Sequence, residues 1–408
     1  MMEESAFVAL RRQLLNDQLQ LGLSDKQAAA RILEKDRVLD EEEGVPGTFT
    51  SRAWGVSRAM DELKPMKITR RLPLAHEVLI DILFSGMCRS DEHHVRNDWN
   101  DSQFPMVPGH EICGRVRAVG DGVTKLRVGM FVAVGNLVDS CRECDQCEAG
   151  SEQLCTSGGP TWTYNSHDRF YKGRRWLLPH GLPTMGGYSD SIVCDENYVL
   201  RIPPKLTDAA TLPRVAPLLC AGITVFNPLF TEKVAGKTVG VAGVGGLGHL
   251  AVKMARALGA SVIAFTTSAW KLKHATKKLG AQDAVLSLDA ADRQRYFGKL
   301  DLLLDTVPVP HDLDQYAELL KPTGKLVVLG NMNEFTKLTG LKFVFYGKSL
   351  RGSNTGGIQM TQDCLDFCAA KDILPDVEVV AAHEINQAMR RMVNREAAFR
   401  MVIDASTF

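Results

Sequence analysis

Alternating apolar and polar positions mark the chain from about residue 50 to residue 200. Clear examples are residues 77–83 and 115–120, which lie between segments rich in Gly, Pro, Asn and Asp. A period of two is typical of half-buried β-strands, and the intervening residues are those that turns prefer. We therefore predict a mostly β module over this part of the chain.

A different pattern begins near residue 207. An apolar strand is expected at 238–242, followed by a glycine-rich turn and a helix at 249–258. A strand at 261–265, a helix ending near Gly280 and strands at 301–305 and 325–330 continue the alternation. Repeated βαβ units predict a parallel, doubly wound sheet. A helix at 362–370 and strands at 377–380 and 400–403 are expected to return to the first module.

The first residues form a separate segment with apolar side chains at roughly helical spacing. Pro46 and Gly47 disfavour helix and mark the end of this segment. We predict a helical extension over residues 1–49 that packs on the protein or on another copy, with regulation or partner binding as the alternative. The apolar stripe begins with Phe7, Leu10, Leu14, Leu15, Leu19 and Leu21.

The predicted elements divide the chain into three parts. The extension covers 1–49, a catalytic domain combines 50–206 with 356–408, and a nucleotide-binding domain covers 207–355. A chain of 408 residues with 45% hydrophobic and 24% charged residues has the composition of a globular protein with large cores. Two compact domains and an extension are the expected organisation.

Charge and composition narrow the classes of partner. Lys plus Arg and Asp plus Glu each number 48, so we expect neither a nucleic-acid nor a membrane-surface partner. The apolar run at 239–265 is interrupted by His249, Lys253 and Arg256, which argues against a membrane span. No signal-peptide pattern is visible, and we expect a cytoplasmic protein. Ten cysteines in a reducing compartment favour metal binding or catalysis over disulfides.

Four cysteines with short spacings form a candidate metal site. They follow the pattern C-x2-C-x2-C-x7-C in a segment that is rich in Asp and Glu. Four thiolates can close a tetrahedron around Zn²⁺ and leave no open position, so this metal would be structural. The familiar iron–sulfur spacings differ from this one, and four free thiols are the remaining alternative. The candidate ligands are Cys141, Cys144, Cys147 and Cys155.

A catalytic zinc uses three protein ligands and one exchangeable position, and its ligands come from distant parts of a chain. Cys88, His110 and Cys220 are candidates. Each is weak alone, because a lone cysteine among apolar residues is more often a small buried hydrophobe. Cys113, Cys194, Cys364 and Cys368 keep that interpretation.

Five motifs in order give these candidates a context. They are G-x-C-x-S-D at 86–91, P-G-H-E at 108–111, the four-cysteine segment, P-L-L-C-A-G-I-T at 217–224 and a glycine-rich turn. From about residue 60 onward the chain resembles the zinc-containing medium-chain alcohol dehydrogenases, and among them the cinnamyl-alcohol-dehydrogenase-like aldehyde reductases. The resemblance implies an α/β fold with a partly open, GroES-like β catalytic domain and a Rossmann domain. It also implies two zinc ions per chain.

The same resemblance assigns roles around the catalytic zinc. Cys88, His110 and Cys220 would be its ligands, with Glu111 beside the metal and able to exchange with water. Asp91 would accept the second ring N–H of His110 and so fix its tautomer.

A proton relay would run from the hydroxyl of Ser90 through the cofactor ribose to His93, whose near-neutral pKa suits the last step. His94 is a rival by sequence alone, although we expect it at the surface. Arg89 departs from the His or Thr usual in the aldehyde-reductase subgroup. It is expected to contact the cofactor pyrophosphate, and an ordinary surface cation is the alternative.

The glycine-rich turn predicts a dinucleotide site. The pattern G-x-G-x-x-G follows an apolar strand and precedes a helix, so the backbone can approach a pyrophosphate at the helix N-terminus. By resemblance, Thr224 also belongs to the cofactor site. The residues of the turn expected to bind the cofactor are Gly243, Gly245, Gly246, Leu247 and Gly248.

The end of the next strand indicates which cofactor binds. NAD-dependent enzymes place Asp or Glu there to bind the ribose 2′-hydroxyl, and residues 264–271 contain no carboxylate. Thr267, Ser268 and Lys271 would instead accept a 2′-phosphate, although hydroxyl side chains also fill ordinary turns. We predict NADP(H).

The predicted reaction is the NADP(H)-linked interconversion of primary alcohols and aldehydes, with aldehyde reduction in the cell. Reduction of conjugated C=C or iminium bonds on the same scaffold is an alternative, as is a non-catalytic binding protein. Trp99, Trp162 and Leu137 are candidates for an apolar substrate pocket. The basic segment 166–185 is expected to be a solvated loop, with a lid or an oligomer contact as the alternatives. A homodimer or homotetramer is expected.

Overall fold

The computed structural model describes residues 47–167, 183–330, 333–394, 396 and 399–408. The predicted helix of the N-terminal extension and most of the basic segment 166–185 lie outside the described residues. The described residues form two compact units. One extends to Cys220 and includes Gly357–Gln362 and Asp376–Phe408, and the other comprises Ala221–Gly356 and Asp363–Pro375. The first division, after Cys220, lies 14 residues beyond the boundary expected after residue 206. The second lies one residue beyond the boundary expected after residue 355, and residues 363–375, which include part of one helix, belong to the second unit instead of the first.

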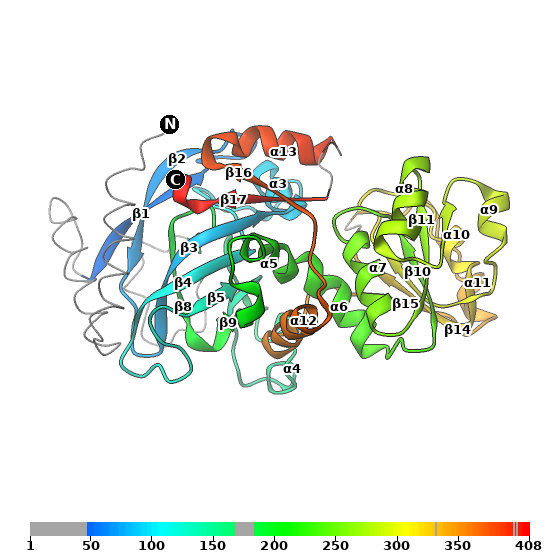
Figure 1. Ribbon diagram of the computed structural model, residues 1–408, viewed down its shortest axis with the longest axis horizontal. Coiled ribbons are helices and arrows are strands. Elements are labelled where there is room, and N and C mark those ends of the chain that lie inside the picture. The colour runs from blue at the N-terminus through cyan, green and yellow to red at the C-terminus, as the bar shows by residue number, and fades with distance from the viewer. Residues whose placement is uncertain (1–46, 168–182, 331–332, 395, 397–398) are drawn as a thin grey trace. The chain divides into compact units, whose positions relative to one another are not determined.

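The first unit is built on a seven-stranded sheet (Figure 1). Its order is β16-β17-β3-β4-β5-β9, with β8 paired to β3, and only β16 and β17 are parallel. The C-terminal strands therefore return to the first module, as predicted. The strands are β3 (Glu77–Met87), β4 (Ile112–Val119), β5 (Phe131–Val134), β8 (Ser191–Asp195), β9 (Leu200–Arg201), β16 (Val377–Ala381) and β17 (Arg400–Asp404).

Two strand pairs and several short helices complete this unit. The antiparallel pairs are β1 (Thr48–Gly55) with β2 (Lys64–Arg71), and β6 (Leu137–Asp139) with β7 (Thr161–Trp162). The helices are α3 (Arg89–Arg96), α4 (Asp145–Glu148), α5 (Leu212–Val215) and α13 (Ile385–Val393). The 3₁₀ turns are η1 (Glu152–Leu154), η3 (Glu196–Tyr198), η4 (Pro204–Leu206), η5 (Ala216–Leu219), η7 (Ala382–Glu384) and η8 (Ala405–Thr407).

Two apolar clusters hold this unit together. One contains inward-facing residues of β3, β4 and β5, including Val78, Ile112 and Val132. The other contains Met87 at the end of β3 and Tyr188. The alternating apolar and polar residues at 77–83 lie in β3 of this sheet. The strand is nevertheless buried along most of its length, because it pairs with β4, β8 and β17.

The second unit is a six-stranded, wholly parallel sheet with the order β12-β11-β10-β13-β14-β15. Counted from β10 along the chain, this is 3-2-1-4-5-6, the strand order of a dinucleotide-binding Rossmann sheet. The predicted α/β fold class is confirmed. The strands are β10 (Thr238–Ala242), β11 (Ser261–Thr266), β12 (Asp283–Leu286), β13 (Leu300–Asp305), β14 (Leu320–Val328) and β15 (Ser349–Gly352).

The helices of the second unit precede, connect or follow these strands, and the last of them is divided between the two units (Figure 1). They are α6 (Ala221–Thr231), α7 (Gly248–Ala257), α8 (Ala269–His274) with the π-helical turn η6 (Ala275–Leu279), α9 (Ala290–Gln294), α10 (Asp314–Ala317), α11 (Leu341–Val344) and α12 (Ile358–Lys371). Among the described residues, no single helix has the length and apolar character to cross a membrane. The bent pair Leu212–Leu219 and Ala221–Thr231 meets that test together.

Candidate functional site

Cys88 lies where β3 ends and α3 begins. Its extended backbone makes it the N-cap of α3, and the Asp91 carboxylate accepts a hydrogen bond from the Cys88 backbone N–H at 2.9 Å. A side-chain acceptor of this kind satisfies an amide that the helix itself leaves unpaired. The start of the helix thus fixes the position of the Cys88 thiol.

Two distant segments bring the other predicted ligands to Cys88. His110 and Glu111 precede β4, after Gly109, whose φ of 106° favours glycine. Cys220 follows η5 directly. One donor atom from each of Cys88, His110, Glu111 and Cys220 lies within 4.8 Å of the others.

The spacing of these donors fits zinc. The Sγ atoms of Cys88 and Cys220 are 3.7 Å apart. A tetrahedron with Zn–S bonds of about 2.3 Å has S···S edges of about 3.8 Å. Two sulfurs and one imidazole nitrogen are also donors that zinc prefers. The fourth donor of the group is a carboxylate, where a closed site would have another sulfur or nitrogen.

Electrostatics at this group favour a thiolate at Cys88 but not at Cys220, because the hydrogen bond between them raises the pKa of Cys220 well above its usual value. The hydrogen bond with Cys220 lowers the pKa of Cys88 well below its usual value, against the effect of burial. Burial lowers the pKa of His110, but the Asp91 carboxylate outweighs it and the pKa is raised well above the usual value. Burial raises the pKa of Glu111 to about 7 despite its ion pair with Arg400. A cation bound among these donors would favour the thiolate form of both cysteines and the neutral form of His110.

The predicted relay residues lie along α3. The Ser90 hydroxyl is 3.7 Å from the Cys88 sulfur, and His93 Nδ1 lies 2.8 Å from a carboxylate oxygen of Asp98. Among the hydrogen bonds of the described residues, none joins Ser90 to His93. Arg89 is partly exposed, with its Nε 3.2 Å from the Glu92 carboxylate.

His94 is not the surface residue that the sequence suggests. Only 18% of its side chain is exposed, and its Nδ1 lies 2.7 Å from the hydroxyl of Tyr164. The Tyr164 ring in turn stacks on His110, with ring centroids 5.9 Å apart. Trp99 contacts the rings of both His93 and His94. Aromatic rings therefore surround one side of the predicted zinc ligands.

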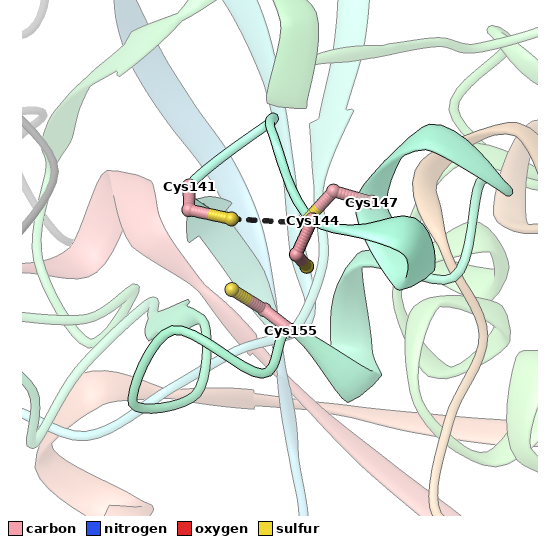
Figure 2. A group of neighbouring side chains, drawn as sticks. All are labelled: Cys141, Cys144, Cys147 and Cys155. Carbon is pink, nitrogen blue, oxygen red and sulfur yellow. Dashed lines mark hydrogen bonds between the residues drawn. The ribbon is translucent and has the colours of Figure 1, made fainter.

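The four predicted structural ligands lie together in the first unit. Figure 2 shows Cys141, Cys144, Cys147 and Cys155 with their sulfur atoms turned toward a common centre. Their sulfurs lie within 4.8 Å of one another, and those of Cys141 and Cys147 are 3.8 Å apart. This distance also equals the edge of a zinc–sulfur tetrahedron, about 3.8 Å.

Local backbone groups favour the thiolate form in this group. Backbone and side-chain hydrogen bonds, the largest from the Thr156 amide, lower the pKa of Cys144 to about 5. Burial raises the pKa of Cys147 to about 12 even though Ser140 Oγ lies 3.2 Å from its sulfur. A cation would be needed to hold all four sulfurs as thiolates.

The glycine-rich turn of the second unit follows β10. Gly243 has a φ of 88°, and a Cβ on Gly248 would lie 1.8 Å from the Gly243 carbonyl oxygen. These two glycines are required by the fold. No atom lies within 4 Å of a Cβ placed on Gly245, so the second glycine leaves open space beside the turn. Gly246 and Leu247 complete the turn before α7 begins.

The predicted cofactor residues outside the turn lie in two places. Lys271 on α8 donates its ammonium to the Val244 carbonyl at 2.8 Å, which links the end of β11 to the turn. Thr267 and Ser268 lie between β11 and α8. Thr224 is on α6, where its hydroxyl donates to the Asn354 carbonyl at 2.6 Å.

Several residues of the site were not indicated by the sequence. Arg400 in β17 pairs with Glu111 across 289 positions, and Tyr188 donates to Asp91 at 3.2 Å across 97 positions. No local pattern reveals such partners. Of the pocket candidates, Leu137 is buried in a core cluster with Trp162 packed against it, so Leu137 has a packing role.

Comparisons with known proteins identify the family of this chain. Residues 74–204 match a model of the alcohol dehydrogenase GroES-like domain, and residues 246–370 match a model of zinc-binding dehydrogenases. NADP-dependent alcohol dehydrogenase C 1 of Mycolicibacterium smegmatis is 44% identical over 359 residues, which are 88% of this chain and 99% of the relative. The aldehyde reductase YahK of Escherichia coli is 43% identical, with coverage of 87% and 98%.

Two solved structures are similar over the same length. A cinnamyl alcohol dehydrogenase of Sorghum bicolor superposes with a TM-score of 0.81 at 36% identity, covering 88% of this chain and 98% of its own. A cinnamyl alcohol dehydrogenase of Helicobacter pylori, solved with NADP(H), has a TM-score of 0.78 at 36% identity, with coverage of 88% and 99%.

Proposed function

Because the chain belongs to the zinc-containing medium-chain alcohol dehydrogenases, we propose that it interconverts primary alcohols and aldehydes with NADP(H), and that it reduces aldehydes in the cytoplasm. One observation carries this function: Cys88, His110 and Cys220 converge with the spacing of a zinc site. Among the described residues, Glu111 is the remaining donor of this group that could take the fourth position, and Arg400 pairs with one of its two carboxylate oxygens. Substrate oxygen can therefore take that position.

The first unit is proposed as the catalytic unit and to hold two zinc ions. A zinc ion at Cys88, His110 and Cys220 would polarise the substrate oxygen as a Lewis acid. The four sulfurs of Cys141, Cys144, Cys147 and Cys155 would hold the other ion in a closed, structural site.

The residues on α3 are proposed to move the proton that accompanies hydride transfer. Ser90 lies beside Cys88 and is placed to donate its hydroxyl proton toward the substrate oxygen. The Nδ1 atom of His93 lies 2.8 Å from a carboxylate oxygen of Asp98, which fixes the orientation of its ring. The absence of a direct Ser90–His93 hydrogen bond among the described residues agrees with a relay that includes the cofactor ribose.

The second unit is proposed as the NADP(H)-binding unit. Its strand order and glycine turn support a pyrophosphate site at the N-terminus of α7, formed by Gly243, Gly245, Gly246, Leu247 and Gly248. Thr267, Ser268 and Lys271 lie after β11, where a 2′-phosphate would be bound. Arg89 and Thr224 are proposed as further cofactor contacts.

A homodimer formed through the second unit is proposed as the assembly. Strand β15 is an edge of the parallel sheet, and all four of its residues are exposed. Nearby, Val344 and Phe345 are 80% and 75% exposed. An exposed edge strand beside apolar side chains favours pairing with another copy. Light scattering of Val344→Glu against the wild type tests this assembly, which a monomeric wild type would exclude.

Metal analysis and steady-state kinetics test the function. The purified protein should contain two zinc ions per chain and reduce benzaldehyde with NADPH. The Cys88→Ser variant should retain its fold and one zinc ion but lose this activity. Cys113→Ser, which replaces a buried thiol outside both groups, is the matched control. Reduction of an enone without reduction of benzaldehyde would refute the proposed reaction, and a single zinc in the wild type would refute the two-site composition.

A further inference from the structure

The Asp91 carboxylate is completely buried and accepts four hydrogen bonds. Oδ1 accepts from the Gly109 backbone N–H and from His110 Nδ1, both at 3.1 Å. Oδ2 accepts from the Cys88 backbone N–H at 2.9 Å and from the Tyr188 hydroxyl at 3.2 Å. Three of these donors belong to a proposed zinc ligand or its neighbour. Tyr188 is the donor that comes from elsewhere in the chain.

Tyr188 is rigidly placed. Its side chain is fully buried in the apolar cluster that includes Met87. Its backbone N–H donates to the Pro108 carbonyl at 2.9 Å, and its carbonyl accepts from Trp54 at 2.8 Å. A Cβ on Gly109 would lie 2.6 Å from the Tyr188 ring, so the ring fills the space beside the turn that carries His110. Packing and backbone bonds therefore fix the phenol against Asp91.

The four-cysteine group has a similar partner. Ser140 Oγ lies 3.2 Å from the Cys147 sulfur and 2.7 Å from the hydroxyl of Tyr198. Both Ser140 and Tyr198 are buried, and the Arg142 guanidinium lies over the Tyr198 ring at 5.1 Å. With Cys147 as a thiolate, Ser140 can donate to sulfur only if its oxygen accepts from Tyr198 or from no group. The phenol therefore orients the serine hydroxyl toward the sulfur.

We propose that a buried tyrosine stabilises each zinc site through one intermediate side chain, Tyr188 through Asp91 and Tyr198 through Ser140. Both are positioning residues, because neither touches a metal-binding atom. The inference rests on the two-zinc composition proposed above. Partners that orient metal ligands typically change metal affinity by about 10- to 100-fold when they are removed. A residue one step further away should act at the lower end, about tenfold.

Zinc release from the full-length protein tests this proposal. The protein is mixed with excess of a chromogenic chelator, and release is followed as two phases, which Cys88→Ser assigns to the two sites. Tyr188→Phe should accelerate release from the Cys88 site about tenfold and leave the four-cysteine site unchanged. Tyr198→Phe should do the reverse. Each variant removes one hydroxyl and keeps the ring, so each serves as the packing control for the other.

The outcomes separate three cases. Equal acceleration of both phases in either variant would indicate general loosening of the protein and overturn the proposal. Release rates in both variants equal to those of a wild type that contains two zinc ions would also overturn it. When the variants release zinc at the wild-type rates, the proposed function still stands. A wild type without zinc at the Cys88 site would refute the function and the proposal together. Asp91→Ala tests the same bond from its other end, because it removes the acceptor and adding Tyr188→Phe to it should then give no further acceleration.

Discussion

Gly245→Ala is expected to weaken cofactor binding without weakening the fold. No protein atom lies within 4 Å of the added methyl group, and Gly245 is not among the glycines with positive φ. An alanine that fits its backbone stabilises a protein by about 0.4–1 kcal/mol, since it restricts the unfolded chain. The melting temperature of the cofactor-free variant should therefore equal or exceed that of the wild type.

The methyl group would occupy the space through which a pyrophosphate approaches the turn. Displacing the phosphates should cost one charge-assisted hydrogen bond, about 1.5–3 kcal/mol. The Kd for NADPH should then rise roughly 10- to 100-fold. Nucleotide fluorescence titration measures this Kd, and differential scanning fluorimetry measures the melting temperature.

Gly248→Ala is the matched comparison, because its Cβ would lie 1.8 Å from the Gly243 carbonyl oxygen. This variant should lose thermal stability as well as affinity. Wild-type affinity in Gly245→Ala would show that the cofactor does not approach the turn there. If the melting temperature of Gly245→Ala fell as far as that of Gly248→Ala, the inference that a methyl group fits the open space at Gly245 would be refuted.

Three further predictions concern other parts of the molecule. Lys271→Ala should lower kcat/KM for NADPH about tenfold and change that for NADH less than about twofold, since only NADPH carries the 2′-phosphate; equal losses with both cofactors would contradict this role. Arg400→Met should reduce the free energy of unfolding by about 3 kcal/mol because it leaves the buried Glu111 carboxylate without its partner, and adding Glu111→Gln should recover part of the loss. Removing zinc with a chelator should abolish aldehyde reduction but leave NADPH binding intact, and restored activity on adding Zn²⁺ is the control.

The sequence predicted elements better than it predicted contacts. The strand expected at 238–242 coincides with β10, and the helix expected at 249–258 lies within one residue of α7. Both follow from strong periodicity bounded by glycines. The amphipathic helix α13, with Ile385 and Met389 buried, was missed because its short apolar pattern gave no distinctive boundary. Its stability comes from packing on a core assembled from distant segments.

The predicted zinc ligands were found from motifs, whereas their supporting residues were not. Cys88 and His110 occur in short boxes that identify their chemistry. Arg400, Tyr188 and Tyr198 have no such context, because each acts through a tertiary contact with a residue far away in the chain. His94 shows the same limitation, since only the fold brings it to Tyr164. Long-range partners of this kind depend on the sheet register that brings segments together.

The four-cysteine segment has a consequence for how the protein matures. Its regular elements β6, α4, η1 and β7 contain only 3, 4, 3 and 2 residues, too few to bury a core of their own. A bound metal would stabilise this segment in place of an apolar core. Synthesis under zinc starvation should therefore yield chains whose main sheets are formed while this segment stays open to proteases. The cell's supply of zinc would then limit the yield of mature enzyme, independently of transcription or translation.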